Sequence, residues 1–231
     1  MSDQRFPVIA VVIDDLGIQS DLTDRAIELD SFVALSFLPY SSDVIWQSTL
    51  ARAAGHEILL HMPMEPLSRS NDPGPNALFV DLELHEMLGR LRWAFEKVPH
   101  AVGLNNHMGS RFTADVNGMA TVIGEMKVRN LILLDSRTTP KSVATDVADR
   151  RNLKNLRRDV FLDNDRSKSA IQVQLKLLEK IAVERGSGIA IGHPYAETFD
   201  VLQEWFSDAR SRGFSLIPIT ELAKLKNDRE R

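Results

Sequence analysis

Short apolar runs separated by polar turns recur along the whole chain. Most of these runs are unbroken and do not alternate with polar residues, a pattern typical of strands buried on both faces of a parallel sheet. The sequence predicts strands at residues 8–13, 33–38, 57–61, 101–104, 131–134, 159–162, 189–191 and 214–217.

Helical patterns lie between several of these strands. Apolar residues recur at spacings of three and four in residues 82–98 and 169–185, and a shorter helix is expected at residues 201–209. The last two run towards Gly186 and Gly213, and glycine commonly follows the last turn of a helix. Alternation of strands and helices indicates βαβ units. Seven or eight strands in this length favour a closed (β/α) barrel over an open doubly wound sheet, which remains the alternative.

No repeat, low-complexity block or linker interrupts the chain, so residues 1–231 are expected to form one domain. The composition, 43% hydrophobic and 26% charged, is that of an ordinary globular protein. A net charge of −4 leaves no basic excess for binding nucleic acid or an anionic membrane. The first residues contain no apolar leader core, and no apolar run is long enough to span a membrane. The residues therefore predict either a cytoplasmic protein or a chain that lacks its leader.

Polar groups follow six of the predicted strands. In a parallel α/β fold the carboxyl ends of the strands form one rim, where active sites are built. The groups at these ends are Asp14 and Asp15; His61 and Glu65; Asn106, His107 and Arg111; Asp135 and Arg137; Asp163; and His193. Because they recur at strand ends, we interpret them as one active site.

The strongest candidates also have simpler interpretations. Asp14 or Asp15 could cap the following helix, but a cap needs only one carboxylate, and two adjacent ones repel unless a cation or a proton relieves them. His61 and His107 would each be structural if taken alone. Beside a double aspartate, they become candidate metal ligands.

The other candidates stay open between surface and site roles. Glu65 lies between two prolines and could be a solvated loop residue, while Arg111 and Arg137 could be surface charges. Asp163 and Asp165 could cap the next helix. For Asp165 the cap is the favoured interpretation, and for Asp163 a role in the site is favoured.

The chain has no cysteine, so any metal must be held by His, Asp or Glu. Three histidines (His56, His85 and His100) lie among polar neighbours and are predicted to be solvent-exposed. Two histidines and a carboxylate with open positions form a common site for Zn²⁺ or another divalent transition metal. A second carboxylate can then act as general base and a separate histidine as general acid. The sequence offers neither a Gly-x-Ser-x-Gly elbow nor a Gly-rich phosphate loop.

The order of these motifs matches a known family. They are Ile13-Asp-Asp-Leu-Gly17, His61-Met-Pro-Met-Glu-Pro66, Asn105-Asn-His-Met-Gly-Ser-Arg111, Asp135-Ser-Arg137, Phe161-Leu-Asp163 and Gly192-His-Pro194. From about residue 8 to residue 226 the chain resembles the divergent polysaccharide deacetylase family, a branch of the NodB-type carbohydrate esterase superfamily. The resemblance implies a distorted (β/α) barrel of about seven strands with a divalent metal, usually zinc.

The resemblance also assigns roles to single residues. It makes Asp14 the catalytic base, Asp15 and His61 metal ligands, and His193 the catalytic acid. Typical members carry a second metal-binding histidine four residues after the first, and here that position is Glu65. We expect His107, at the end of the next strand, to replace it.

The other rim residues are expected to bind substrate or to support the ligands. They are Glu65, Asn106, Arg111, Asp135, Arg137 and Asp163. The function implied is hydrolytic removal of acetyl from an N- or O-acetylated carbohydrate. The alternative is a non-catalytic, metal-containing protein that binds carbohydrate or associates with the cell envelope. The resemblance further implies a periplasmic or otherwise extracytoplasmic location.

Overall fold

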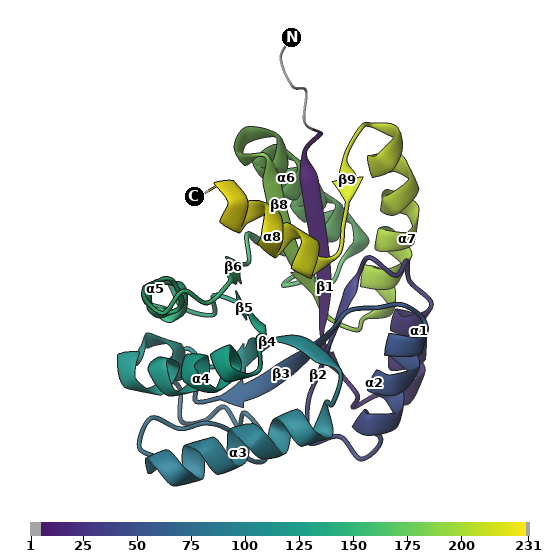
Figure 1. Ribbon diagram of the computed structural model, residues 1–231. Helices are drawn as coiled ribbons and strands as arrows, with labels where there is room; N and C mark the ends of the chain where they lie inside the picture. Colours follow the sequence, from purple (N-terminus) through teal and green to yellow (C-terminus); the bar gives the residue numbers. More distant parts are fainter. Residues whose placement is uncertain (1–5, 230–231) are drawn as a thin grey trace.

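A single curled sheet of parallel strands organises the structure, a computed structural model that describes residues 6–229, with side chains through residue 226 (Figure 1). The strand order is β6-β5-β4-β3-β2-β1-β8-β7, and β9 pairs with the start of β1. The strands are β1 (Val8–Leu16), β2 (Ala34–Phe37), β3 (Ile58–Met64), β4 (Ala101–Met108), β5 (Ile132–Asp135), β6 (Asn155–Arg157), β7 (Val160–Phe161), β8 (Ser187–Gly192) and β9 (Ser215–Leu216). All eight predicted strands are confirmed. The leader prediction rests partly on residues 1–5, which lie outside the described residues.

One extended segment joins the two ends of the strand order. Strands β6 and β7 lie at opposite ends of that order, yet only Arg158 and Asp159 separate them in the sequence. The Arg158 backbone N–H donates to Asp135 O on the β5 side at 3.0 Å, and that of Asp159 donates to Ile189 O of β8 at 2.9 Å. The sheet therefore curls into a distorted (β/α) barrel, as predicted, and is not an open doubly wound sheet. With β6 and β7 counted as one, the barrel has seven strands besides β9.

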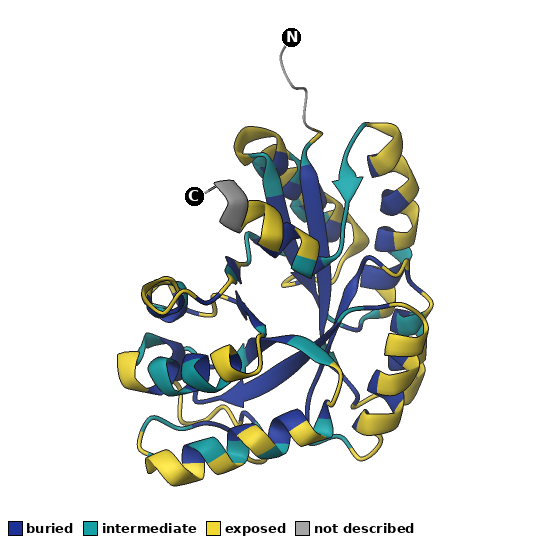
Figure 2. Cartoon of the chain, viewed as in Figure 1, coloured by how far each residue is buried: buried dark blue, intermediate teal, exposed yellow. Residues whose placement is uncertain are grey.

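Helices surround this barrel, and the last of them also packs against the side chains of its interior. The helices are α1 (Ser20–Ile27), α2 (Val44–Ala53), α3 (Leu84–Lys97), α4 (Val116–Val128), α5 (Ala144–Arg150), α6 (Lys168–Arg185), α7 (Ala196–Ser211) and α8 (Ile219–Arg229), with a 3₁₀ turn η1 (Phe112–Ala114). The three predicted helices are α3, α6 and α7. Figure 2 shows the strands buried and the helices exposed along their outward faces, the pattern of amphipathic helices on a buried sheet.

Alternate residues of β1 belong to two different apolar clusters. Every second residue from Ile9 to Ile13 packs among helix residues. Val8, Ala10 and Val12 fill the barrel interior together with α8. Successive side chains of a strand point to opposite faces, so the inward row continues from Val12 to Asp14. The polar end of this inward row begins the candidate site.

His56 corrects one prediction. The ring is wholly buried, with Nδ1 2.8 Å from Val33 O and Nε2 3.0 Å from Ile27 O, although polar neighbours in the sequence predicted exposure. It lies just before β3, where the carbonyl of Val33 faces one ring nitrogen and that of Ile27 faces the other. His85 and His100 are exposed, as predicted. Within the described part of the chain, no helix combines the length and the apolar character needed to cross a membrane.

Candidate metal centre

An irregularity in β1 brings two adjacent carboxylates to the same place. The pairing of β1 with β2 shifts register between Ile13 and Leu16, and Asp15 has a φ of 57°, in the left-handed region that Asp tolerates better than most residues. In a regular strand Asp14 and Asp15 would point to opposite faces. Neither of them caps α1, whose N-cap is Gln19. The cap interpretation of the pair is therefore wrong.

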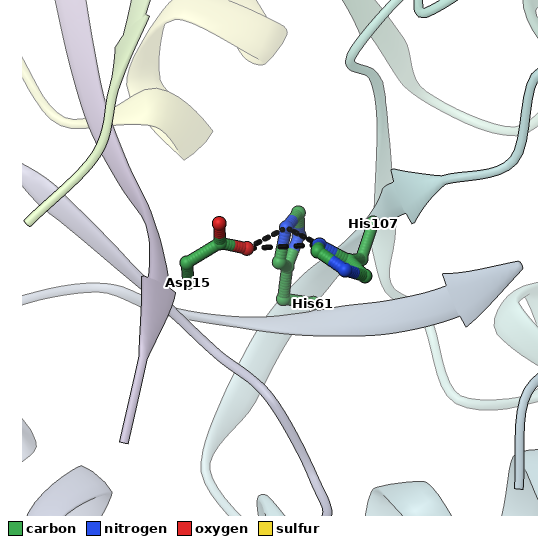
Figure 3. Close-up of side chains that lie close together, drawn as sticks. All are labelled: Asp15, His61 and His107. Carbon is green, nitrogen blue, oxygen red and sulfur yellow. Dashed lines mark hydrogen bonds and ion pairs between the residues drawn. The ribbon is translucent and has the colours of Figure 1, made fainter. Parts of the chain in front are cut away.

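Three side chains from three strands converge beside this bulge (Figure 3). Asp15 Oδ1 lies 2.8 Å from His107 Nδ1 and 3.1 Å from His61 Nε2, and the two ring nitrogens lie 3.3 Å apart. The imidazole rings meet edge to face, at 72°. His61 is buried in β3, whereas His107 in β4 and Asp15 are partly exposed, so the cluster opens towards solvent. The structure therefore brings together the three residues that the sequence predicts as metal ligands.

The chemistry of this cluster fits a divalent cation. Asp15 Oδ1 is buried and accepts no hydrogen bond of suitable geometry, although two ring nitrogens lie within 3.1 Å of it. Ligand atoms held about 2.0–2.1 Å from a tetrahedral Zn²⁺ are themselves about 3.3 Å apart, close to the spacings found here. One carboxylate oxygen and two imidazole nitrogens are a donor set that zinc and related transition metals accept.

Charge balance in the cluster points the same way. Burial favours the protonated carboxyl, but the rings of His107 and His61 outweigh it and hold the pKa of Asp15 well below its usual range. Burial disfavours a charged imidazole, but Asp14 and Asp15 outweigh it and raise the pKa of His61. The cluster thus attracts positive charge. Without a cation protons supply that charge, and a bound cation would displace them.

Asn105 fixes how His61 and Asp14 are presented. Its Oδ1 accepts from His61 Nδ1 at 2.9 Å and from Ser36 Oγ at 2.6 Å, and its Nδ2 donates to Asp14 Oδ1 at 2.7 Å and to Ser136 Oγ at 3.2 Å. When His61 Nδ1–H donates this hydrogen bond to Asn105, the lone pair of Nε2 faces the cluster. Asn105 and His107 are two residues apart on β4, so they share one face.

Asp163, which follows β7, and His193, which follows β8, form a second hydrogen-bonded pair. Asp163 Oδ1 lies 2.7 Å from His193 Nδ1, and Asp163 Oδ2 accepts from the His193 backbone N–H at 2.6 Å and from Thr198 Oγ1 at 2.8 Å. Burial disfavours the charged ring, but the Asp163 hydrogen bond and charge, with smaller effects of Asp14 and Asp15, raise the pKa of His193 to about 9. With Nδ1 held by Asp163, Nε2 is the ring nitrogen left to donate a proton, which is the geometry that a general acid needs.

Two further predicted residues pair away from the ligands. Glu65 Oε1 accepts from Arg111 Nη1 at 2.7 Å, and Glu65 Oε2 accepts from the Val80 backbone N–H at 2.9 Å. Glu65 is buried, which removes the solvated-loop interpretation. Among the described residues no hydrogen bond or ion pair joins this pair to Asp15, His61 or His107.

The polar groups near the ends of β4 and β5 and after β7 mostly bind backbone groups. Asn106 accepts from the Ser136 N–H at 2.9 Å and donates to Met108 O at 2.7 Å, so it ties two rim loops together. Asp135 accepts from the N–H of Arg137, whose side chain is exposed. Asp165 accepts from the N–H of Ser167, the N-cap of α6. Asp165 thus supports the start of a helix, as favoured from the sequence, although Ser167 is the cap itself.

Three residues at or near this site were not predicted from the sequence: Asn105, Ser36 and Arg158. For Asn105 a signal existed, because alternation along a strand puts it, and not Asn106, on the same face as His107. Ser36 is a polar residue inside an apolar run, which also marks an inward polar position. Arg158 lies between two very short strands, and nothing in the local sequence separates it from neighbouring surface arginines.

Comparison with known proteins assigns the family. The divergent polysaccharide deacetylase family matches residues 11–223, almost the whole chain. The chain belongs to this family. The uncharacterized protein YibQ of Escherichia coli K12 is 37% identical over 196 residues, which cover 85% of this chain and 61% of that protein. The chain described here thus spans about three fifths of the length of YibQ.

Solved structures share the fold. An uncharacterized protein from Agrobacterium tumefaciens C58 superposes with a TM-score of 0.91 at 27% identity, covering 96% of this chain and 91% of that one. The peptidoglycan deacetylase PdaC from Bacillus subtilis has a TM-score of 0.55 at 13% identity, covering 99% and 95%. A CE4 family pseudoenzyme from Bacillus anthracis also has a TM-score of 0.55, at 12% identity, covering 94% and 66%. At such identities the last two likenesses show the fold alone.

Proposed function

We propose that the protein is a metal-dependent hydrolase that removes acetyl groups from an N- or O-acetylated carbohydrate. The observation that carries this proposal is the convergence of Asp15 Oδ1, His61 Nε2 and His107 Nδ1 at 2.8–3.3 Å from one another. Membership of the divergent polysaccharide deacetylase family supports the class of substrate.

Asp15, His61 and His107 would hold the cation, for which zinc is the first choice from the donor set. Such a cation, when bound, polarises the acyl carbonyl and makes water more acidic. Residues that would hold the cation also adjoin Asp14, whose Oδ2 lies 3.7 Å from His61 Nε2. The proposed metal ligands and the proposed base therefore lie next to one another.

Asp14 is the proposed base. Burial raises the pKa of Asp14, which makes its carboxylate a better proton acceptor, while the charges of His61 and His193 act in the opposite direction. Its Oδ1 is occupied by Asn105, so Oδ2 is the oxygen left to take a proton from the attacking water.

His193 is the proposed acid. As the carbon–nitrogen or carbon–oxygen bond of the acetyl group breaks, His193 Nε2 gives its proton to the leaving amine or alcohol, and acetate is the other product. A pKa of about 9 keeps the ring protonated at neutral pH, which suits a proton donor. Asp163 holds the ring in the orientation that this step needs.

Release of acetate tests this function. Protein stripped with a chelator and then reloaded with Zn²⁺ is incubated with N-acetylated and O-acetylated oligosaccharides, and acetate is quantified. We expect release from at least one substrate with metal and none after stripping. Equal release from stripped protein would contradict the metal requirement. If no substrate releases acetate, a non-catalytic carbohydrate-binding or envelope-associated protein becomes the better account.

The proposal includes a location. Because the family resemblance implies an exported protein, we place the activity outside the cytoplasm, where an acetylated polysaccharide is accessible. Cell fractionation of the native protein tests this part separately from the enzyme assay.

A further inference from the structure

The Arg158 side chain lies near the proposed acid, and the charge of Arg137 acts on it. Among the described residues, no carboxylate oxygen lies within ion-pair distance of Arg158 or Arg137, whereas many other arginines of the chain have such a pair. Arg158 is half-buried and Arg137 is exposed. An unpaired, partly buried guanidinium has lost water without gaining an anion, so its position needs a reason.

The protein holds Arg158 in place with neutral groups only. Its Nε donates to Ser136 O at 2.6 Å and its Nη2 donates to Arg137 O at 3.0 Å. Its guanidinium lies 3.6 Å from the centre of the Phe161 ring. Nη1 has no protein acceptor among the described residues and is not buried, so one face of the fork remains available to a ligand.

This guanidinium borders the site already described. The Phe161 ring beneath it lies 5.7 Å from the His193 ring, centre to centre. The backbone carbonyl that Arg158 binds belongs to Ser136, whose hydroxyl accepts from Asn105, the partner of Asp14. A group held by Arg158 would therefore lie next to the sugar whose acetyl group faces Asp14 and His193.

Electrostatics favours an anion at this position. Burial and the neighbouring charge of Arg137 lower the pKa of Arg158 to about 10, while Asp135, Asp14 and Asp159 act against this from beyond ion-pair distance. An anion bound between two guanidinium groups reduces their mutual repulsion and so stabilises both charges. A guanidinium fork fits the two oxygens of a carboxylate or phosphate.

We propose that Arg158 and Arg137 form a subsite for an oxyanion, carboxylate or phosphate, carried by the glycan next to its acetylated sugar. This inference rests on the proposed function, because that function places the acetylated sugar beside His193. The substrate class is then an acidic acetylated glycan.

Matched ligand pairs test the subsite by calorimetry at low salt. For carboxylate, a hyaluronan tetrasaccharide is compared with an N-acetylglucosamine tetramer. For phosphate, N-acetylglucosamine 6-phosphate is compared with N-acetylglucosamine. We expect the acidic member of at least one pair to bind roughly 10- to 100-fold more tightly, the range for hydrogen bonds to a charged group. The pair that shows the preference identifies the source of the oxyanion.

Variants separate the subsite from general charge effects. Arg158→Gln and Arg137→Gln should each lose most of the preference, and Arg137→Gln changes an exposed side chain, so it folds even if Arg158→Gln does not. Arg52→Gln, at an exposed position in the last turn of α2, is the matched control and should keep the preference.

Equal affinity within both pairs, an unchanged preference in both variants, or no binding of any probe would overturn the subsite. Acetate release, measured in parallel, keeps the two proposals apart. Release from neutral substrates without an acidic preference leaves the hydrolase standing and removes the subsite. A preference for the acidic ligand without any acetate release supports the subsite and removes the hydrolase.

Discussion

His193 makes two hydrogen bonds to Asp163, one from its ring Nδ1 at 2.7 Å and one from its own backbone N–H at 2.6 Å. The carboxylate therefore fixes both the rotation of the ring and the tautomer. The side chain of Asp163 is fully buried, and Thr198 supplies a third hydrogen bond to it. Asp163 is thus a positioning residue whose charge also sets the proton affinity of the proposed acid.

The first prediction concerns pH. As general acid, His193 must be protonated, and its pKa is raised to about 9, so kcat/KM should fall as pH rises through about 9. Asp163→Asn removes the carboxylate that raises this pKa, so the alkaline limb should move towards neutral pH. The pH–rate profiles of the two proteins provide the measurement. An unshifted alkaline limb in the variant would show that another group controls it.

The second prediction separates chemistry from metal binding. Asp14→Asn and His193→Ala should each lower kcat by roughly 10²–10⁴-fold, the usual effect of removing an acid or base. Both should still bind about one equivalent of Zn²⁺, because neither belongs to the three-residue cluster. Full activity in either variant, on a substrate that wild type hydrolyses, would remove the role assigned to that residue.

The barrel and the rim could be predicted because they follow from repeated patterns. Unbroken apolar runs define parallel strands, and the carboxyl ends of such strands share one edge. That reasoning places Asp15, His61 and His107 near one another without any knowledge of the three-dimensional distances. It cannot supply the bulge that turns Asp15 beside Asp14, because a register shift depends on the partner strand.

Other features depend on contacts that the local sequence does not contain. His56 reads as a surface residue, yet two carbonyls from distant segments enclose its ring. The position of Arg158 depends on the segment that pairs first with β5, through Arg158, and then with β8, through Asp159. Asn105, by contrast, can be found from the sequence, since strand alternation puts it and not Asn106 on the face of His107. The residues that escaped prediction are mainly those whose surroundings come from far along the chain.

The third prediction concerns Asn105. Because it holds His61 Nδ1 and Asp14 Oδ1 at the same time, Asn105→Ala should weaken Zn²⁺ affinity by roughly 10- to 100-fold, the range for partners of metal ligands. Competition with a zinc-binding dye measures the affinity. Asn117→Ala, at an exposed position of α4, is the control and should leave it unchanged. Equal affinities of Asn105→Ala and wild type would show that His61 needs no such support.

The fourth prediction tests the packing of β4. A Cβ on Gly103 would lie 2.6 Å from both the carbonyl oxygen and Cγ1 of Ile132 on the neighbouring strand. Backbone cannot move aside as a side chain can, so Gly103→Ala should destabilise the fold by about 1–3 kcal/mol. Gly89 in α3 is the control, because a Cβ there meets nothing within 4 Å. Gly89→Ala should stabilise by up to about 1 kcal/mol. Denaturant unfolding compares the two, and equal midpoints would contradict the predicted clash.

The central claim is that Asp15, His61 and His107 bind one divalent cation, and zinc titration of stripped protein tests it most directly. Wild type should bind about one equivalent. His107→Ala should lose more affinity than the roughly 10- to 100-fold expected for a partner of a ligand. His85→Ala, at an exposed position of α3, should bind like wild type. If His107→Ala holds zinc as tightly as wild type, the three-residue assignment is wrong.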